Sequence, residues 1–523
     1  MAKKQNWIRE HLFSSIFPAL LFGALSGVVS ALVVTLYKCC AKHAVSLSEI
    51  WIPFLRKNLF YLPLALLILW ILSALFSRIY RKEADLGGGG IPASIGNLRG
   101  LFRFHWQKSL FGSFFLSLIN FVIGVPLGTE GPSVQMGTSL GFGVVRLFPE
   151  KWRAWERYSA TGGASAGFSV ATGTPLSGIL FSIEEAHQRI SPLIVITAVI
   201  SVLFAGITSH LISPLFGVEN ALFSVPVLPS LSLKELWLPL SVGLVFGMVS
   251  FLFLKFYTVL DRLFHQVLKK LSHQQKIFLL FSLTLLLGLF SLSFISTGHH
   301  LILSYFTEIP AVWMLLLIFL LRTTLTCSAN LNSLTGGIFL PLLAIGATLA
   351  AILAKLCLSC GVSSERIPMI LVLGICGCIG GMMKMPLTAV LFGVEALGLS
   401  QNLIPTLCCV SLAFVLPEAM GAESINDLAL KRKEKTLPPR ALVTQEITLT
   451  VEKNSFAVGK EVRDIFWPHG VFVLSAKHLN DACPLLEEGD RLSILMKTSR
   501  PEETRALLSA ILESAPTDRK NKT

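Results

Sequence analysis

Residues 174–186 read TPLSGILFSIEEA, and residues 385–397 read MPLTAVLFGVEAL. Both stretches carry Pro-Leu, then Leu-Phe, then Glu at identical spacing, 211 residues apart. Proline is tolerated in the first turn of a helix, where its missing N–H has no intrahelical acceptor to lose. Each stretch therefore predicts an apolar helix that begins at its proline and ends near its glutamate.

A second matched pair lies upstream of these helices. Residues 132–137 and residues 341–346 both begin with proline and end with glycine, at an offset of 209. Two matches in the same order are difficult to obtain by chance from apolar sequence. We therefore expect an internal structural repeat, with one half at about residues 12–215 and the other at 235–430. Matching interruptions of apolar segments in two halves point to a binding site near the middle of a membrane.

The composition of the chain is that of a membrane protein. Its 523 residues have a mean hydropathy of +0.68, and 53% of them are hydrophobic while only 14% are charged. Soluble domains carry roughly 25% charged residues. Apolar runs occur at 60–76, 193–209 and 276–296, and runs near 20 residues can cross a bilayer as helices. The sequence predicts an all-α protein with many membrane spans.

The positions of the basic residues predict the orientation of the chain. The net charge is +13, with Lys3, Lys4 and Arg9 before an apolar first span at about 12–37 and a basic run at 431–435 after the last span. The first span is too long for the core of a signal peptide, so we expect it to be retained. Under the positive-inside rule both ends are cytoplasmic. This pattern favours lipid contact over nucleic-acid binding.

Beyond residue 430 the chain becomes polar, which predicts a separate small domain. Alternation of polar and apolar residues predicts three strands and then an amphipathic helix, at 446–451, 470–474, 491–496 and 501–512. The predicted boundaries are a membrane domain at 1–430, a charged linker at 431–445, an α+β domain at 446–515 and a polar tail at 516–523.

Three segments place glycine or proline immediately before an apolar helix. They are Gly87–Pro92, Gly128–Pro132 and Gly336–Pro341. The first N–H groups of such a helix lack intrahelical acceptors and lie at the positive end of the helix dipole, so they can bind an anion. Glycines also permit close helix packing in membranes. Because three loops share the pattern, we favour an anion site at which they converge.

Glu130 stands alone among glycines and prolines in GVPLGTEGPSVQMG, residues 124–137. A carboxylate at membrane depth is costly and usually functional. At an anion site, its side chain can occupy the site when ionised and leave it when protonated. Glu184 and Glu185 are neighbours on a predicted helix and point about 100° apart, so one can face a polar cavity while the other meets an aqueous or interhelical partner. The alternative is a solvated pair at a helix end.

Together these motifs resemble those of the CLC family of chloride channels and proton-coupled chloride transporters. The family's G-S-G-I-P, G-(R/K)-E-G-P and G-G-x-F-x-P loops and its P-L-x-G-x-x-F-x-x-E-E helix correspond to Gly88–Pro92, Gly128–Pro132, Gly336–Pro341 and Pro175–Ala186. The stretch at 386–397 also matches, and the resemblance spans about residues 12–430. It implies an inverted repeat of tilted and partial helices, and a homodimer with one pore per subunit.

The resemblance also implies roles for individual residues. Glu130 matches the external gating glutamate and Glu185 the internal proton-transfer glutamate, and Glu184 is expected on a secondary proton or water pathway. No cofactor is expected. The residues expected to contact the anion are Gly88, Gly89, Gly90, Ile91, Thr129, Glu130, Gly131, Ile338, Phe339 and Asn426.

Three positions depart from the family pattern. Gly89 replaces a serine whose hydroxyl contacts the anion, Asn426 aligns with the tyrosine of the inner gate, and Thr129 replaces a basic residue. The two retained glutamates favour an exchanger of chloride-like anions and protons. The missing serine and tyrosine favour a passive, proton-gated chloride channel. A fluoride-selective anion/proton exchanger is the third alternative.

The C-terminal sequences WPHGVFVL at 467–474 and PLLEEGDRLSIL at 484–495 resemble the regulatory module of bacterial potassium-uptake proteins, the TrkA-C type. This resemblance implies a bacterial inner membrane. Such a module either binds a small ion or nucleotide or serves to dimerise.

Overall fold

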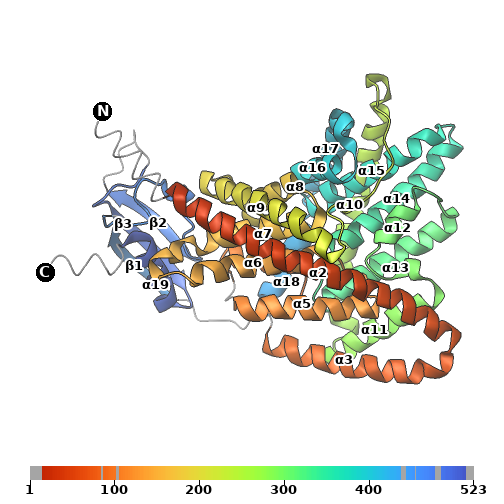
Figure 1. Ribbon diagram of the computed structural model, residues 1–523, viewed down its shortest axis with the longest axis horizontal. Helices are drawn as coiled ribbons and strands as arrows, with labels where there is room; N and C mark the ends of the chain where they lie inside the picture. The colour runs from red at the N-terminus through yellow and green to blue at the C-terminus, as the bar shows by residue number, and fades with distance from the viewer. Residues whose placement is uncertain are drawn as a thin grey trace.

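In the computed structural model, long helices lie side by side and a small sheet lies at one end of them (Figure 1). The structure describes residues 15–83, 86–101, 105–436, 443–453, 455–477 and 485–513. The helices of the first half are α2 (Phe17–Lys57), α3 (Leu62–Lys82), α4 (Gly90–Leu98), α5 (Trp106–Ile123), α6 (Glu130–Arg146), α7 (Glu156–Thr172), α8 (Pro175–Phe181) and α9 (Pro192–Phe216). Those of the second half are α10 (Trp237–Val267), α11 (His273–Phe290), α12 (His299–Ser304), α13 (Val312–Leu331), α14 (Phe339–Ser359), α15 (Ile367–Cys378), α16 (Pro386–Ala396), α17 (Leu403–Ala419) and α18 (Ile425–Thr436).

The order of helices in the first half is repeated in the second. α8 begins at Pro175 and α16 at Pro386, while α9 and α17 begin at Pro192 and Leu403, so both pairs are 211 residues apart. The prolines of α8 and α16 lie in the first turn, as the sequence predicts. Two pairs of helices thus have the spacing that the expected internal repeat requires, and the two halves at about 12–215 and 235–430 stay a prediction.

The apolar runs become helices long enough to cross a membrane. Within the described ranges, nine helices are long and apolar enough to do so. Large apolar side chains such as Leu64, Leu67 and Ile71 on α3 are about half exposed, which suits contact with lipid chains rather than water.

The first span is longer than predicted. The sequence suggests 12–37, but α2 runs from Phe17 to Lys57, 41 residues, or about 60 Å. The apolar run ends near Lys38, yet small and apolar residues remain buried on one face as far as Leu55. Because that face continues to pack, the helix continues although polar and charged residues now interrupt its exposed face.

The C-terminal domain is a three-stranded antiparallel sheet covered by one helix. Its strands β1 (Val443–Thr450), β2 (Val471–Lys477) and β3 (Arg491–Thr498) lie in the order β1-β3-β2. Alternate β3 side chains pack with the apolar face of α19 (Pro501–Leu512). All three predicted strands and the predicted helix are confirmed, although β1 begins at residue 443 rather than 446.

Phe466 joins this domain to the membrane helices. The guanidinium groups of Arg157 and Arg189 lie 4.8 and 4.6 Å from the centre of its ring, and the His187 ring lies 4.6 Å from it. The Tyr158 hydroxyl accepts a hydrogen bond from the Phe466 N–H at 3.2 Å. The C-terminal domain is therefore held at the first turn of α7 and at the segment that follows α8.

Candidate functional site

The three glycine loops meet at one place in the fold. Gly128 and Gly337 exchange two backbone hydrogen bonds, at 2.6 and 2.8 Å, which join the loop before α6 to the loop before α14. A methyl group on Gly90 would overlap the carbonyl of Gly131, and one on Gly131 would lie 2.6 Å from the Cα of Gly337. The loop before α4 therefore packs against the other two so closely that only glycine fits. The predicted convergence is confirmed.

Glu130 lies at this junction, as the first residue of α6, and is fully buried. A methyl group on Gly128 would overlap its Oε2 and would also lie 3.1 Å from Cβ of Leu340, in the first turn of α14. The backbone N–H of Leu340 faces the carboxylate, and Thr129 Oγ1 lies 3.3 Å from Oε1. The carboxylate thus occupies the N-terminal ends of two helices, where the helix dipoles favour negative charge.

Ile338 and Phe339 fix the backbone on the α14 side of the junction. Both are buried, and the Phe339 ring packs edge-on against Phe168 and Phe392 at 5.3 and 5.4 Å. These aromatic contacts anchor the first turn of α14, so its N–H groups keep their orientation toward the junction.

Lys38 is a residue of the site that sequence reasoning missed. It extends from the middle of α2, and its Nζ donates to the carbonyls of Val170 and Glu219 at 3.0 and 3.2 Å. Its positive charge acts on the Glu130 carboxylate. A lysine directly after the long apolar run of α2 was the signal that could have identified it.

Glu185 lies in a second polar group, on the short π-helix Ser182–His187 that follows α8. It is 3% exposed. Arg99, at the end of α4, donates to the carbonyls of Glu185 and Ala186 at 2.9 and 3.0 Å, and its Nη1 lies 3.7 Å from Asp427. Arg99 also escaped sequence reasoning, because its contacts lie 86 residues and more away along the chain.

Asn426 belongs to this second group. It is fully buried and lies beside Glu185. Neither its Nδ2 nor its Oδ1 makes a hydrogen bond of acceptable geometry within the described residues. The structure therefore places Asn426 beside Glu185, and its expected contact with the anion stays a prediction.

Glu184 points elsewhere and binds the start of α16. Its two oxygens accept hydrogen bonds from the N–H groups of Leu387 and Thr388 and from Thr388 Oγ1, at 2.6 to 2.8 Å. Glu395 accepts the three equivalent bonds from the first turn of α8, at 2.7 to 3.0 Å. Reciprocal contacts of this kind are those of a two-fold arrangement of the halves. The geometry supports a capping role for Glu184, and its place on a proton or water pathway stays a prediction.

Solved structures share this fold. A slow cyanobacterial Cl⁻/H⁺ antiporter superposes with a TM-score of 0.70 at 24% identity, covering 80% of this chain and 98% of that one. A CLC-type fluoride/proton antiporter superposes with a TM-score of 0.61 at 22% identity, covering 77% of this chain and 96% of that one. At these identities the likeness shows the architecture alone.

Sequence relatives cover most of the chain. The H(+)/Cl(−) exchange transporter ClcA of Vibrio vulnificus (strain YJ016) is 28% identical over 445 residues, which are 81% of this chain and 91% of that protein. The ClcA of Citrobacter koseri is 29% identical over 427 residues, 79% of this chain and 88% of that protein. The family described as voltage gated chloride channel matches residues 64–418, which is more than half of the sequence. The chain belongs to the voltage-gated chloride channel (CLC) family.

Proposed function

We propose that this protein exchanges chloride, or a similar monovalent anion, for protons across a membrane. The observation that carries the proposal is the position of Glu130, a fully buried carboxylate at the N-terminal ends of two helices. Such ends bind anions, so the ionised carboxylate competes with a transported anion for the same place. One proton removes that competitor. Anion entry and proton uptake at Glu130 are thereby linked.

Two further observations support exchange rather than simple conduction. Glu185, buried on its π-helix, supplies a second proton-accepting group on another element. The curated relatives that span most of the chain are named H(+)/Cl(−) exchange transporters.

The test is chloride-driven proton movement by the purified protein in liposomes. With chloride loaded on one side and no proton gradient, an exchanger moves protons against their own gradient as chloride leaves. Chloride flux without any proton flux would instead establish the passive, proton-gated channel, which the loss of serine at Gly89 and of tyrosine at Asn426 favours. Substitution of fluoride for chloride in the same assay decides the anion preference.

We also propose the placement and assembly of the protein. The first turns of α2 lie on the same side as the C-terminal sheet (Figure 1), where Phe22 packs near Trp155 and Trp155 packs on Phe456. With the basic run at 431–435, this supports a cytoplasmic location for both ends in a bacterial inner membrane. The family resemblance supports a homodimer, and exposed Leu176 and Leu387 provide apolar surface that lipid or a second subunit covers.

We propose that residues 446–515 form a regulatory module of the TrkA-C type. The strand order and the covering helix support a small independent core. A small ion or a nucleotide is the class of ligand that the resemblance suggests. The boundaries at 430, 445 and 515 remain predictions, and α18 extends the last helix of the membrane domain to Thr436.

A further inference from the structure

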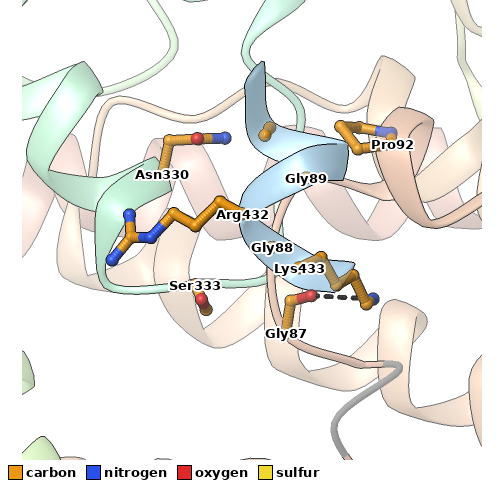
Figure 2. Close-up of a pocket in the computed structure, with 9 residues that line it drawn as sticks. Gly87, Gly88, Gly89, Pro92, Asn330, Ser333, Arg432 and Lys433 are labelled. Atoms are coloured by element: carbon orange, nitrogen blue, oxygen red, sulfur yellow. Dashed lines mark hydrogen bonds between the residues drawn. The ribbon is translucent and has the colours of Figure 1, made fainter. Parts of the chain in front are cut away.

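A small cavity lies beside the glycine loop that precedes α4 (Figure 2). Its volume is about 50 Å³, whereas a single water needs only about 10 to 15 Å³ of such space. It can therefore hold a small ion but not a nucleotide or a phosphate ester. Its polar walls come from three separate parts of the chain, at Gly88, Gly89, Asn330, Ser333, Arg432 and Lys433.

Asn330 carries an unused hydrogen-bond donor into this cavity. The residue is only 6% exposed and lies in the last turn of α13. Its Oδ1 accepts a hydrogen bond from the Tyr257 hydroxyl at 2.6 Å, but its Nδ2 has no partner among the described residues. Helices in membranes are often joined by such polar contacts, which accounts for Oδ1. It does not account for Nδ2, because a buried unsatisfied donor is destabilising.

The unused Nδ2 lies beside Gly89. A Cβ built on Gly89 would be 3.6 Å from it and 3.5 Å from both the Gly336 carbonyl and Pro92 Cδ. Gly89 is the position at which the family pattern has a serine that contacts the anion. The Asn330 amide therefore borders the space that a side chain at position 89 would occupy.

The charge around the cavity is positive. Arg432 and Lys433 line it, and no carboxylate is among the described residues that do so. Lys433 Nζ donates to the Gly87 carbonyl at 3.1 Å. Arg432 Nε lies 3.4 Å from Asp261, and its buried Nη1 has no acceptor among the residues that the structure describes. The N-terminal end of α4 adds its dipole.

We propose that Asn330 Nδ2 is a side-chain ligand for a small monovalent anion in this cavity, in place of the hydroxyl that Gly89 lacks. The proposal rests on the anion transport proposed above and deepens it. The anion is a bare halide or one of similar size. Asn330 sets the affinity of the cavity for the anion, while Arg432 and Lys433 supply the surrounding positive potential.

Chloride titration calorimetry on the full-length protein, purified in detergent without halide, tests the proposal. Asn330→Ala should weaken chloride binding in the cavity by about ten-fold or more, since a hydrogen bond to an ion is lost. Asn330→Asp, which keeps the shape but replaces the NH₂ group by oxygen, should weaken it at least as much. Asn332→Ala is the matched control: Asn332 is a buried neighbour whose Nδ2 bonds the Ser328 carbonyl at 3.0 Å outside the cavity, and its variant should bind as the wild type does.

The decisive variant combines Asn330→Ala with Gly89→Ser. Position 89 has a φ of −43°, and the nearest atoms around a new Cβ lie at ordinary contact distances, so serine fits there. The hydroxyl should restore chloride affinity to within about three-fold of the wild type. Unchanged affinity in Asn330→Ala, or a loss that Gly89→Ser does not restore, overturns the inference. Neither result contradicts the proposed exchange of chloride for protons. That proposal fails only if the wild type moves no protons in response to a chloride gradient.

Discussion

Gly128 shows how strictly the junction constrains single residues. Its Cα faces the Glu130 carboxylate and the first turn of α14, so that even a methyl group would overlap Oε2. The glycine thus allows the carboxylate to lie against Leu340, where two helix ends meet. The position of Glu130 depends on the absence of a side chain two residues earlier.

Gly128→Ala should therefore displace the Glu130 side chain and lower anion-coupled proton transport by about ten-fold or more, because small displacements of a reacting group are costly. The measurement is proton and chloride flux in liposomes. Gly206→Ala is the control, since a Cβ on Gly206 of α9 would meet nothing within 4 Å. Normal transport by Gly128→Ala would show that the carboxylate does not need its present position.

Glu185→Gln tests the second carboxylate. If Glu185 passes protons while the anion follows another route, the variant should lose most proton flux and keep chloride flux, because glutamine has the same shape but no exchangeable carboxyl proton. Parallel recordings with a chloride electrode and a pH electrode measure both. Equal loss of the two fluxes would mean that Glu185 supports the structure rather than carries protons.

The candidate site could be read from the sequence only in part. Glu130 and the three loops are marked by glycine and proline within a few residues, so local patterns suffice to find them. Lys38, Arg99 and Asn330 each contact partners that are at least 73 residues away along the chain. Such contacts leave no local spacing pattern in the sequence.

At the scale of helices, the reciprocal caps of α8 and α16 fix how the halves cross. Glu184→Ala and Glu395→Ala should each lower the apparent midpoint of thermal unfolding, and by similar amounts, since each leaves equivalent N–H groups uncapped at a cost of about 1 to 2 kcal/mol. Fluorescence-detected unfolding in detergent measures this. A loss of stability in one variant only would contradict the two-fold arrangement.

The same pair separates capping from proton transfer. Glu184→Gln and Glu395→Gln disturb equivalent caps, so a purely structural role predicts equal effects on the ratio of proton to chloride flux. A proton or water pathway through Glu184 predicts a lower ratio in Glu184→Gln alone. The ratio is measured in the same liposome recordings.

Lys460 makes the stability of the C-terminal domain depend on pH. Burial lowers the pKa of its ammonium group to about 7, well below the value of about 10.4 in an unfolded chain. Between these values the unfolded state binds a proton that the folded state does not, so stability should rise with pH and be lowest below pH 7. Lys460→Met should remove this dependence.

Hydrogen exchange of β1–β3 amides in the full-length protein, corrected for intrinsic rates, measures the effect. Protection should increase between pH 7 and pH 9 in the wild type and stay constant in Lys460→Met. The same rise in both proteins would assign the dependence to another group.

The element boundaries show what sequence periodicity captures. The Pro-Leu helices and the strands were predicted because their patterns are complete within ten or so residues. The predicted end of α2 was wrong by 20 residues, because polar and charged residues interrupt the apolar run in its last five turns while one face stays packed. Which face of α2 is buried depends on the helices that pack against it, and these are distant in the sequence.

At the scale of the whole molecule, Phe466 connects the C-terminal domain to the segment that carries Glu185. Its ring touches His187, which is two residues from Glu185, and Thr161 Oγ1 lies 2.8 Å from His187 Nε2. A change in the C-terminal domain can therefore reach the segment that carries Glu185 through this aromatic contact.

Phe466→Ala should destabilise both the C-terminal domain and the segment at 182–187, because deletion of a buried aromatic ring costs about 3 to 5 kcal/mol. Hydrogen exchange should rise at residues 182–187 as well as in the domain itself. Phe472→Ala, which truncates an exposed ring on β2, is the control and should change neither. Unaltered exchange at 182–187 in Phe466→Ala would rule out this connection.

Glu130→Gln in liposomes tests directly whether Glu130 links chloride flux to proton flux. The amide cannot ionise, so it no longer competes with the anion and no longer carries a proton. We expect chloride flux to persist while chloride-driven proton uptake falls to background. Proton uptake that remains coupled to chloride in this variant would contradict the central claim that Glu130 links the two.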